Sequence, residues 1–182
     1  MQGNDQQISV VLLTYNRVGE LTRSLDKLLA MPEQPPVIVV DNASTDARAF
    51  VVAQRHPRVQ CISLLRNIGG AGRNAGVRLA ATPYVAFCDD DSWRENDALG
   101  LAVEILDHYP DVAALCGRVL LGEDCREDPT CAEMAASPCL WRDCPARRCW
   151  ASLPARWCSG ATPIFRPAAM RRASSSAARK CC

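Results

Sequence analysis

The sequence has few of the features that mark secreted, membrane-spanning or zinc-binding proteins. Its apolar runs fall far short of the roughly 20 residues that a membrane-spanning helix needs. Its first residues, MQGNDQQISVVLL, contain no basic segment of a secretory signal. Only two residues are histidine, and no two cysteines have CxxC spacing. We expect a cytoplasmic protein whose cysteines are reduced, and contact with the inner face of the membrane stays open.

The last 44 residues are poor in acidic and aliphatic side chains, unlike the rest of the chain. Residues 139–182 contain nine Lys and Arg against one acid, whereas residues 1–138 contain 12 Lys and Arg against 19 Asp and Glu. The net charge of +1 is therefore the sum of −7 and +8. Only four residues of 139–182 are Leu, Ile, Val or Phe, so this segment can bury little apolar surface. We predict a folded domain over residues 1–138, followed by a poorly structured tail over residues 139–182.

Apolar runs alternate with helical patterns along the predicted domain. Runs typical of strands occupy residues 8–13, 37–40, 59–65, 84–88 and 112–121, the first two with the apolar character of strands buried on both faces and the last with a bend at Gly117. Helical signals occupy residues 21–29, 44–55 and 96–109, and the run at residues 66–76 leads into a further helix that ends near Ala81. This alternation predicts an α/β fold, an open and mostly parallel sheet with helices on both faces.

Polar residues follow four of these predicted strands directly. They are Thr14, Tyr15, Asn16 and Arg17 after the first strand, Asp41 and Asn42 after the second, Arg66 and Asn67 after the third, and Asp89, Asp90 and Asp91 after the fourth. Ligands of open parallel sheets bind outside the carboxyl ends of the strands. The four groups are therefore expected to meet at one edge and form a binding site.

The residue types at this edge suit a metal-bridged nucleoside diphosphate. Strand alternation would place Asp89 and Asp91 on one side of the pleat, where paired carboxylates attract Mg²⁺ or Mn²⁺. The glycine-rich turn at residues 69–72 lets the backbone approach an anion at the start of a helix. Arg73 and Arg66 add positive charge for a diphosphate, and Asp41 is an acceptor for a base or ribose.

Four blocks carry a family resemblance in the right order and spacing: VVLLTYNR (10–17), VVDNASTD (39–46), RNIGGAGRNAG (66–76) and FCDDDSW (87–93). Together they resemble the family-2 glycosyltransferases, inverting enzymes with the Rossmann-like GT-A fold. The resemblance implies transfer of a sugar from a UDP- or dTDP-sugar to a saccharide or glycoconjugate acceptor, assisted by Mn²⁺ or Mg²⁺. It implies no nucleic-acid partner and leaves the oligomeric state open.

The resemblance also implies roles for individual residues. The nucleotide pocket would include Thr14, Tyr15, Asn16, Arg17, Asp41, Asn42, Arg66, Asn67, Gly70, Gly72, Arg73, Asn74, Asp89 and Asp90. Asp89 and Asp91 would occupy the metal-binding DxD positions. The general base of the family belongs to an acceptor-binding half, which residues 139–182 do not resemble.

Two alternatives to a complete enzyme remain. We predict that this chain keeps the donor site but lacks the acceptor half, because we interpret residues 139–182 as the product of a frameshift near residue 139. The chain would then be a non-catalytic nucleotide-sugar-binding remnant. Gly70, Gly72 and Ala75 also fit the GxGxx[GA] fingerprint of NAD-binding domains, although that fingerprint normally follows the first strand and three acids would repel an unmetallated pyrophosphate.

Overall fold

The computed structural model of the protein describes residues 7–45, 56, 58–110, 112–122, 124–136, 156–158 and 164–165. Its strands are β1 (Ile8–Thr14), β2 (Val37–Asp41), β3 (Val59–Ser63), β4 (Tyr84–Asp89), β5 (Trp93–Arg94), β6 (Ala114–Leu115), β7 (Arg118–Leu121), β8 (Arg126–Glu127), β9 (Arg156–Cys158) and β10 (Ile164–Phe165). Its helices are α1 (Val18–Ala30), α3 (Arg73–Leu79), α4 (Ala98–His108) and α5 (Pro129–Ala136), with a 3₁₀ turn, η1 (Gly69–Gly72), before α3.

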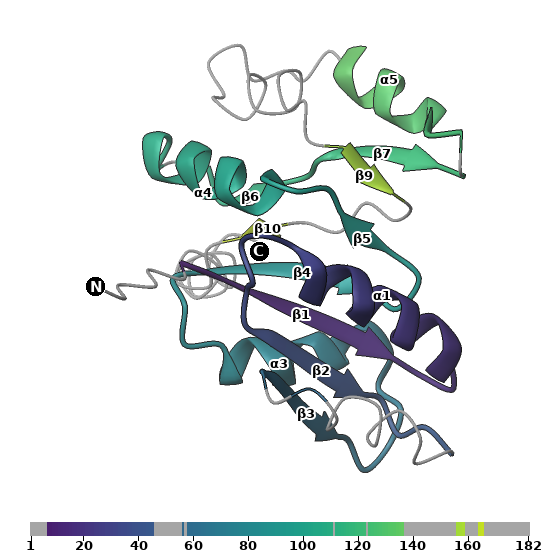
Figure 1. The fold of residues 1–182 in the computed structure, drawn as a ribbon. Helices are drawn as coiled ribbons and strands as arrows, with labels where there is room; N and C mark the ends of the chain where they lie inside the picture. The colour runs from purple at the N-terminus through teal and green to yellow at the C-terminus, as the bar shows by residue number, and fades with distance from the viewer. Residues whose placement is uncertain are drawn as a thin grey trace, which may run out of the picture.

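The main sheet has six strands in the order β3-β2-β1-β4-β10-β6 (Figure 1). β3, β2, β1 and β4 are parallel, and β10 pairs antiparallel with both β4 and β6. Because β1 and β4 are neighbours although β2, β3, α1 and α3 come between them in the chain, the sheet is built by crossover connections. The predicted α/β fold with a mostly parallel sheet is confirmed.

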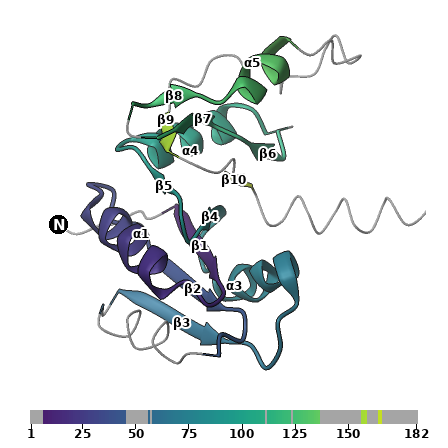
Figure 2. The ribbon, with the colours of Figure 1, turned by 90° about the vertical axis from the view of Figure 1, so that its right-hand side faces the viewer.

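Helices cover both faces of this sheet, as the edge-on view in Figure 2 shows for α1 and α3. Along β1, Val10 and Leu12 belong to the core cluster shared with α1 and α4. Val11 and Leu13 point to the opposite face, where residues of α3 pack. This alternation follows from the period of two in a strand, and it explains why β1 is apolar at every position from Val10 to Leu13.

Helix α1 has the amphipathic pattern expected of a helix that covers a sheet. Its buried residues are Leu21, Ser24, Leu25 and Leu28. The helix ends at Ala30, and the next residue, Met31, is extended with ψ 140°. Pro32 follows, and a proline excludes the helical conformation for the residue before it. The end of α1 is therefore encoded locally.

A second, smaller sheet has the order β5-β9-β7-β8. β5 pairs antiparallel with β9, and β7 pairs parallel with β9 and antiparallel with β8. In Figure 1 this sheet lies above the main sheet, beside α4 and α5. β5 follows the end of β4 by only a short turn, so the second sheet is anchored next to the predicted acidic site.

Two predictions about the later part of the chain need revision. The strand predicted over residues 112–121 with a bend at Gly117 is interrupted there: residues 114–115 join the main sheet as β6 and residues 118–121 join the second sheet as β7. Each half pairs with a strand far away in the sequence, which no local pattern reveals. The helix predicted over residues 44–55 lies almost wholly outside the described residues.

Two short segments of residues 139–182 are described, and both are strands. β9 is central in the second sheet, and β10 lies between β4 and β6 in the main sheet. Ile164 and Phe165 are 0% and 3% exposed, and the Phe165 ring lies 4.5 Å from that of Phe87, centroid to centroid. The boundary predicted between residues 138 and 139 is therefore crossed by pairing in both sheets. Among the described residues, no helix has the length and apolarity needed to cross a bilayer.

Candidate functional site

The carboxyl ends of the parallel strands are aligned at one edge of the main sheet. Thr14 at the end of β1 is in register with Asp41 at the end of β2, and Asp41 is in register with Ser63 at the end of β3. On the other side of β1, Leu13 is in register with Asp89 at the end of β4. The four polar groups that follow these strands therefore start from the same edge, as predicted from their positions in the sequence.

Asp41 is buried where β2 and β3 end, with 4% of its surface exposed. One carboxylate oxygen accepts a hydrogen bond from the backbone N–H of Ser44 at 3.0 Å, and the other accepts one from the Ser63 hydroxyl at 3.3 Å. Each oxygen has a second lone pair that can accept a further hydrogen bond. Burial, with the Asp41 charge as a smaller cause, raises the pKa of the nearby Cys61 thiol to about 11.

Asn16 joins the loop after β1 to the loop after β2. Its backbone N–H donates to the Ser44 hydroxyl at 2.9 Å, and its side-chain oxygen accepts from the backbone N–H of Thr45 at 2.9 Å. Both loops contain a non-glycine residue in the left-handed region, Asn16 at φ 55° and Ala43 at φ 65°. Such conformations are costly and persist where the surrounding contacts hold them. The hydrogen bonds of Asn16 thus hold two loops of the candidate site together.

Asn42 connects β2 to the glycine-rich segment. It is 3% exposed, and its amide nitrogen donates to the Asn67 side-chain oxygen at 2.9 Å and to the Gly69 carbonyl at 3.1 Å. Its oxygen accepts from the Ile68 N–H at 3.0 Å. A Cβ at Gly72 would lie 3.3 Å from this same oxygen and 2.8 Å from the end of the Leu13 side chain, so a larger residue there would require Leu13 to shift. Asn42 therefore fixes the position of the glycine-rich turn.

The acidic turn, which we define as Asp89 to Ser92, begins where β4 ends. The predicted alternation of the three aspartates does not apply beyond Asp89, because the chain turns after it. The Ser92 hydroxyl accepts from the Asp89 N–H at 3.0 Å, and the Ser92 N–H donates to the Asp89 carbonyl at 3.2 Å. These local hydrogen bonds close the turn and separate the environments of the three carboxylates.

Asp90 faces the protein, whereas Asp89 and Asp91 are accessible. Asp90 is 6% exposed and accepts a hydrogen bond from the Thr14 hydroxyl at 3.0 Å, while its backbone carbonyl accepts from the Ser24 hydroxyl of α1 at 2.8 Å. Burial raises the pKa of Asp90 despite the Thr14 hydrogen bond and the positive charge of Arg17. The side chains of Asp89 and Asp91 are 36% and 51% exposed.

Two arginines from other elements neutralise this turn. Arg17, between β1 and α1, lies 3.2 Å from an Asp91 carboxylate oxygen and 3.5 Å from one of Asp90. Arg73, the first residue of α3, forms an ion pair with Asp89. Three further residues of the predicted pocket, Tyr15, Arg66 and Asn74, are exposed in the segments that follow the strands.

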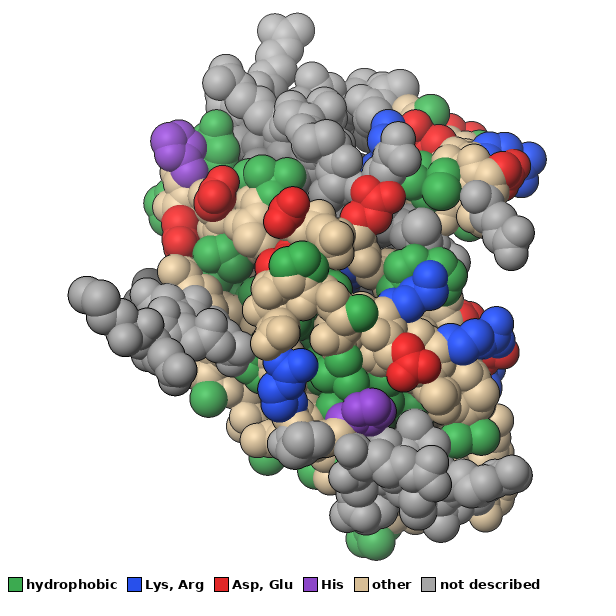
Figure 3. All heavy atoms as spheres, viewed as in Figure 1, with side chains coloured by type: hydrophobic (Ala, Val, Ile, Leu, Met, Phe, Trp, Pro, Cys, Tyr) green, Lys and Arg blue, Asp and Glu red, His purple; other side chains and the backbone are tan. Residues whose placement is uncertain are grey.

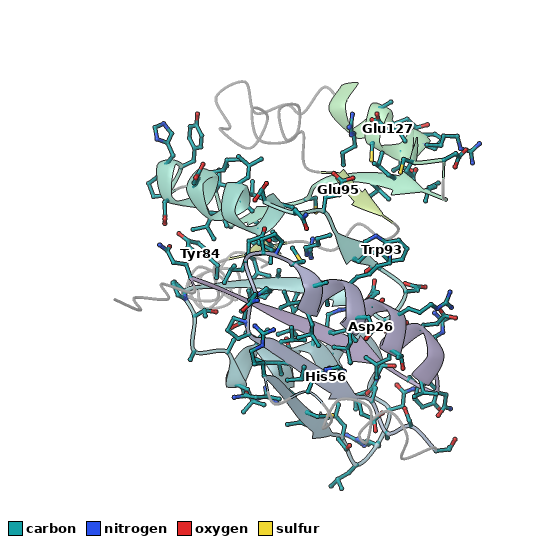
Figure 4. All side chains as sticks on the ribbon, in the orientation of Figure 1. Asp26, His56, Tyr84, Trp93, Glu95 and Glu127 are labelled. Atoms are coloured by element: carbon teal, nitrogen blue, oxygen red, sulfur yellow. The ribbon has the colours of Figure 1, made fainter. Side chains whose placement is uncertain are left out.

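Several residues that shape the turn were not singled out by their pattern. Arg94 of β5 is 4% exposed and donates to the Phe87 carbonyl of β4, and burial lowers its pKa to about 10. The Lys27 ammonium lies 4.1 Å from the centre of the Trp93 ring, so this ring is packed against α1 (Figure 4). Ser24 carried a weak signal, because it is a polar residue among the buried leucines of α1.

The outer surface of α4 carries acidic side chains. Figure 3 shows acidic side chains gathered over α4, where Glu104 and Asp107 are exposed. Within the described part of the chain, no group of three or more His, Cys, Asp or Glu side chains is placed to hold a metal ion by itself.

Comparisons with known proteins agree with this geometry. The family model described as "Glycosyl transferase family 2" matches residues 9–172. The succinoglycan biosynthesis protein ExoO of Rhizobium meliloti (strain 1021) is 36% identical over 124 residues, which are 62% of this chain and 36% of that protein. The curated relatives are thus much longer than this chain.

Two solved structures have the same arrangement of elements, the GT-A fold. The mannosyltransferase PcManGT from Pyrobaculum calidifontis, in complex with GDP-Man and Mn²⁺, has a TM-score of 0.63 at 23% identity, over 92% of this chain and 46% of that one. Residues 1–349 of TarS from S. aureus, in complex with UDP-GlcNAc, have a TM-score of 0.50 at 25% identity, over 63% of this chain and 34% of that one. Since the family match covers most of the chain, the protein belongs to glycosyl transferase family 2.

Proposed function

We propose that this edge binds the nucleotide diphosphate part of a sugar donor, a UDP- or dTDP-sugar. The observation that carries the proposal is the hydrogen-bonded convergence of the four strand ends, which brings a buried Asp41, a glycine-rich turn and an acidic turn to one edge. Related structures hold UDP-GlcNAc in one case and GDP-Man with Mn²⁺ in another, and both ligands belong to this chemical class.

Donor recognition divides between the base and the diphosphate. Asp41 keeps lone pairs for N–H or O–H groups of the base or ribose, and Tyr15 and Arg66 are exposed in the segments that follow β1 and β3. The backbone at Gly70 and Gly72, fixed by Asn42, offers close approach to the diphosphate. Arg17 and Arg73 supply guanidinium groups, which bind phosphate oxygens in pairs of hydrogen bonds.

The acidic turn suits a divalent metal in its donor chemistry. Asp89 and Asp91 present accessible carboxylate oxygens, and Mg²⁺ is commonly bound by one or two carboxylates together with substrate phosphates. A metal bound there would act as a Lewis acid that offsets negative charge on the departing diphosphate. Asp90 would act differently, since its carboxylate is buried against Thr14 and holds the turn in place.

In the transfer itself, an acceptor hydroxyl of a saccharide or glycoconjugate would form a bond to the anomeric carbon as the bond from that carbon to the diphosphate breaks. The hydroxyl proton would pass to a general base, which we assign to the acceptor half of the longer relatives. For the present chain we propose donor binding with little or no transfer by itself.

We also propose a cytoplasmic location for the protein. Cell fractionation tests this location and shows whether the protein also contacts the inner face of the membrane.

An NAD-binding function is less well supported. The fingerprint residues Gly70 and Gly72 follow β3, an outer strand of the main sheet, whereas β1 is followed by Tyr15, Asn16 and Arg17. The acidic turn would also repel a pyrophosphate that carries no metal.

Calorimetric titration of the purified chain tests the proposal. We expect UDP or dTDP to bind in Mn²⁺ and to lose affinity in EDTA, while NAD does not bind. Asp41→Asn should weaken nucleotide binding about tenfold by removing a charged acceptor. Asp26→Asn, on the exposed face of α1 (Figure 4), is the matched control and should leave binding unchanged. Binding of NAD without metal, with UDP and dTDP ignored, would refute the proposal, and efficient transfer by this chain alone would refute its catalytic half.

A further inference from the structure

The two accessible carboxylates of the acidic turn are each held by an arginine from another part of the sheet edge. Arg17 reaches Asp91 from the loop after β1, and Arg73 reaches Asp89 from the start of α3. The arginines are 56 residues apart in the sequence and lie on segments that follow β1 and β3. Two independent segments thus supply the same kind of counterion to the same turn.

The charges at the turn are nearly balanced without any ligand. Three carboxylates face two guanidinium groups, and Arg17 also lies 3.5 Å from the buried Asp90. The nearer contact of Arg17 is with Asp91 and the contact of Arg73 is with Asp89, and these two carboxylates, unlike that of Asp90, are more than one third exposed. A divalent cation that used Asp89 and Asp91 would therefore meet two positive charges already on its ligands.

The arginines themselves need not leave the site when a donor arrives. Arg17 has 57% of its side chain exposed and Arg73 has 25%, so neither guanidinium is locked in the core. A diphosphate is a stronger bidentate partner for a guanidinium than a single carboxylate oxygen. A donor can therefore draw both arginines away from the aspartates and leave carboxylate oxygens for the metal.

We propose that Arg17 and Arg73 make metal binding depend on the donor because each of them changes its partner. In the free protein they pair with Asp91 and Asp89, and they turn to the diphosphate when donor and metal bind together. The inference rests on the proposed function, because it assigns the diphosphate as their second partner. It means that the free protein binds Mn²⁺ weakly, and that nucleotide and metal each raise the affinity for the other by the same factor.

The test measures Mn²⁺ binding to the whole chain without nucleotide, by the electron paramagnetic resonance signal of free Mn²⁺. Arg17→Gln and Arg73→Gln should each bind Mn²⁺ about three- to tenfold more tightly than the unaltered protein, since each removes one repelling charge. Arg23→Gln is the matched control, because Arg23 is an exposed arginine of α1 whose ion pair is with Glu20. It should leave the Mn²⁺ affinity unchanged.

A charge-conserving variant and a second titration separate this role from a structural one. Arg17→Lys should keep the weak Mn²⁺ affinity of the unaltered protein, because the repelling charge stays. In saturating Mn²⁺, the two Gln variants should bind UDP about tenfold more weakly, which is opposite to their effect on the metal. Circular dichroism melts establish that each variant folds.

Each result of these titrations supports or overturns one part of the proposal. Gln variants that bind Mn²⁺ no more tightly than the unaltered protein, or more weakly, would overturn the counterion role. The same holds if Arg17→Lys behaves like Arg17→Gln. If the unaltered protein binds no UDP with Mn²⁺, the proposed donor site fails, whereas the Mn²⁺ titrations without nucleotide still decide whether the arginines oppose the metal.

Discussion

Gly76 determines how closely α3 can approach the main sheet. A Cβ added at this position would overlap one methyl group of Val11 and lie 3.1 Å from the other, and also 3.1 Å from a methyl of Val40. Val11 and Val40 are both 0% exposed and lie on the neighbouring strands β1 and β2. The methyl groups have no free space to move into, so Gly76→Ala must push α3 away from the sheet.

The expected cost follows from two opposing effects. Overpacking a core typically costs about 1–3 kcal/mol, and a clash with side chains on two strands belongs near the upper end. Alanine recovers about 1 kcal/mol of helix propensity relative to glycine. We therefore expect Gly76→Ala to lower the free energy of unfolding by about 2 kcal/mol, which corresponds to about 4–8 °C in Tm for a chain of this size.

Urea denaturation followed by far-ultraviolet circular dichroism measures this change. Gly100→Ala is the matched control, because Gly100 is also helical, in α4, and a Cβ there would meet nothing within 4 Å. It should raise the free energy of unfolding by about 0.5–1 kcal/mol. The opposite signs are the decisive result. Equal stabilisation by both substitutions would refute the close approach of α3 to β1 and β2.

Two further predictions concern the buried Asn42 and the half-buried Cys61. Asn42→Asp replaces the amide that donates to the Gly69 carbonyl by a group that can only accept. We expect this substitution to lower the free energy of unfolding in urea by about 2 kcal/mol or more. Asn74→Asp, at an exposed position, is the near-neutral control. A cost no larger than that of Asn74→Asp would contradict the role of this hydrogen bond. The pKa of Cys61 is raised to about 11 in the folded protein, whereas the same thiol in the unfolded chain ionises near pH 9. The contribution of Cys61 to stability should therefore fall as the pH rises from about 9 to 11. At pH 8, peptide mapping should find Cys61 alkylated by iodoacetamide far more slowly than the exposed Cys125, and equal rates would contradict the burial.

The parallel part of the fold was predictable because its signals are local. The run from Ile8 to Leu13 is apolar on both alternating faces, and the structure packs Val10 and Val11 against opposite helical layers. The polar residues directly after each strand were predicted to share an edge, and the hydrogen bonds among Asn16, Ser44 and Thr45 bring two of these groups into contact. Parallel strands impose this convergence whatever else the chain does.

The prediction was weaker where a contact depends on distant residues. The sequence around Asp90 predicted acidic residues at the end of a strand. The burial of the Asp90 side chain, however, depends on Thr14 and Ser24, which lie 76 and 66 residues earlier in the chain. The division of residues 112–121 into β6 and β7 depends on β10 and β9 as pairing partners. Pairing between strands leaves no periodic trace in either segment, so it cannot be read from one window of sequence.

The amino-acid sequence by itself therefore determined the α/β fold and the edge of the sheet at which the candidate site lies, since apolar periodicity and strand-end polar residues are properties of short segments. Its four motif blocks resembled the family that the comparison shows. Only the tertiary structure decided that Arg17 and Arg73 neutralise the acidic turn, and that Ile164 and Phe165 complete the sheet beside β4. Those contacts join residues that are distant in the chain, and their partners become defined only when the layers pack together.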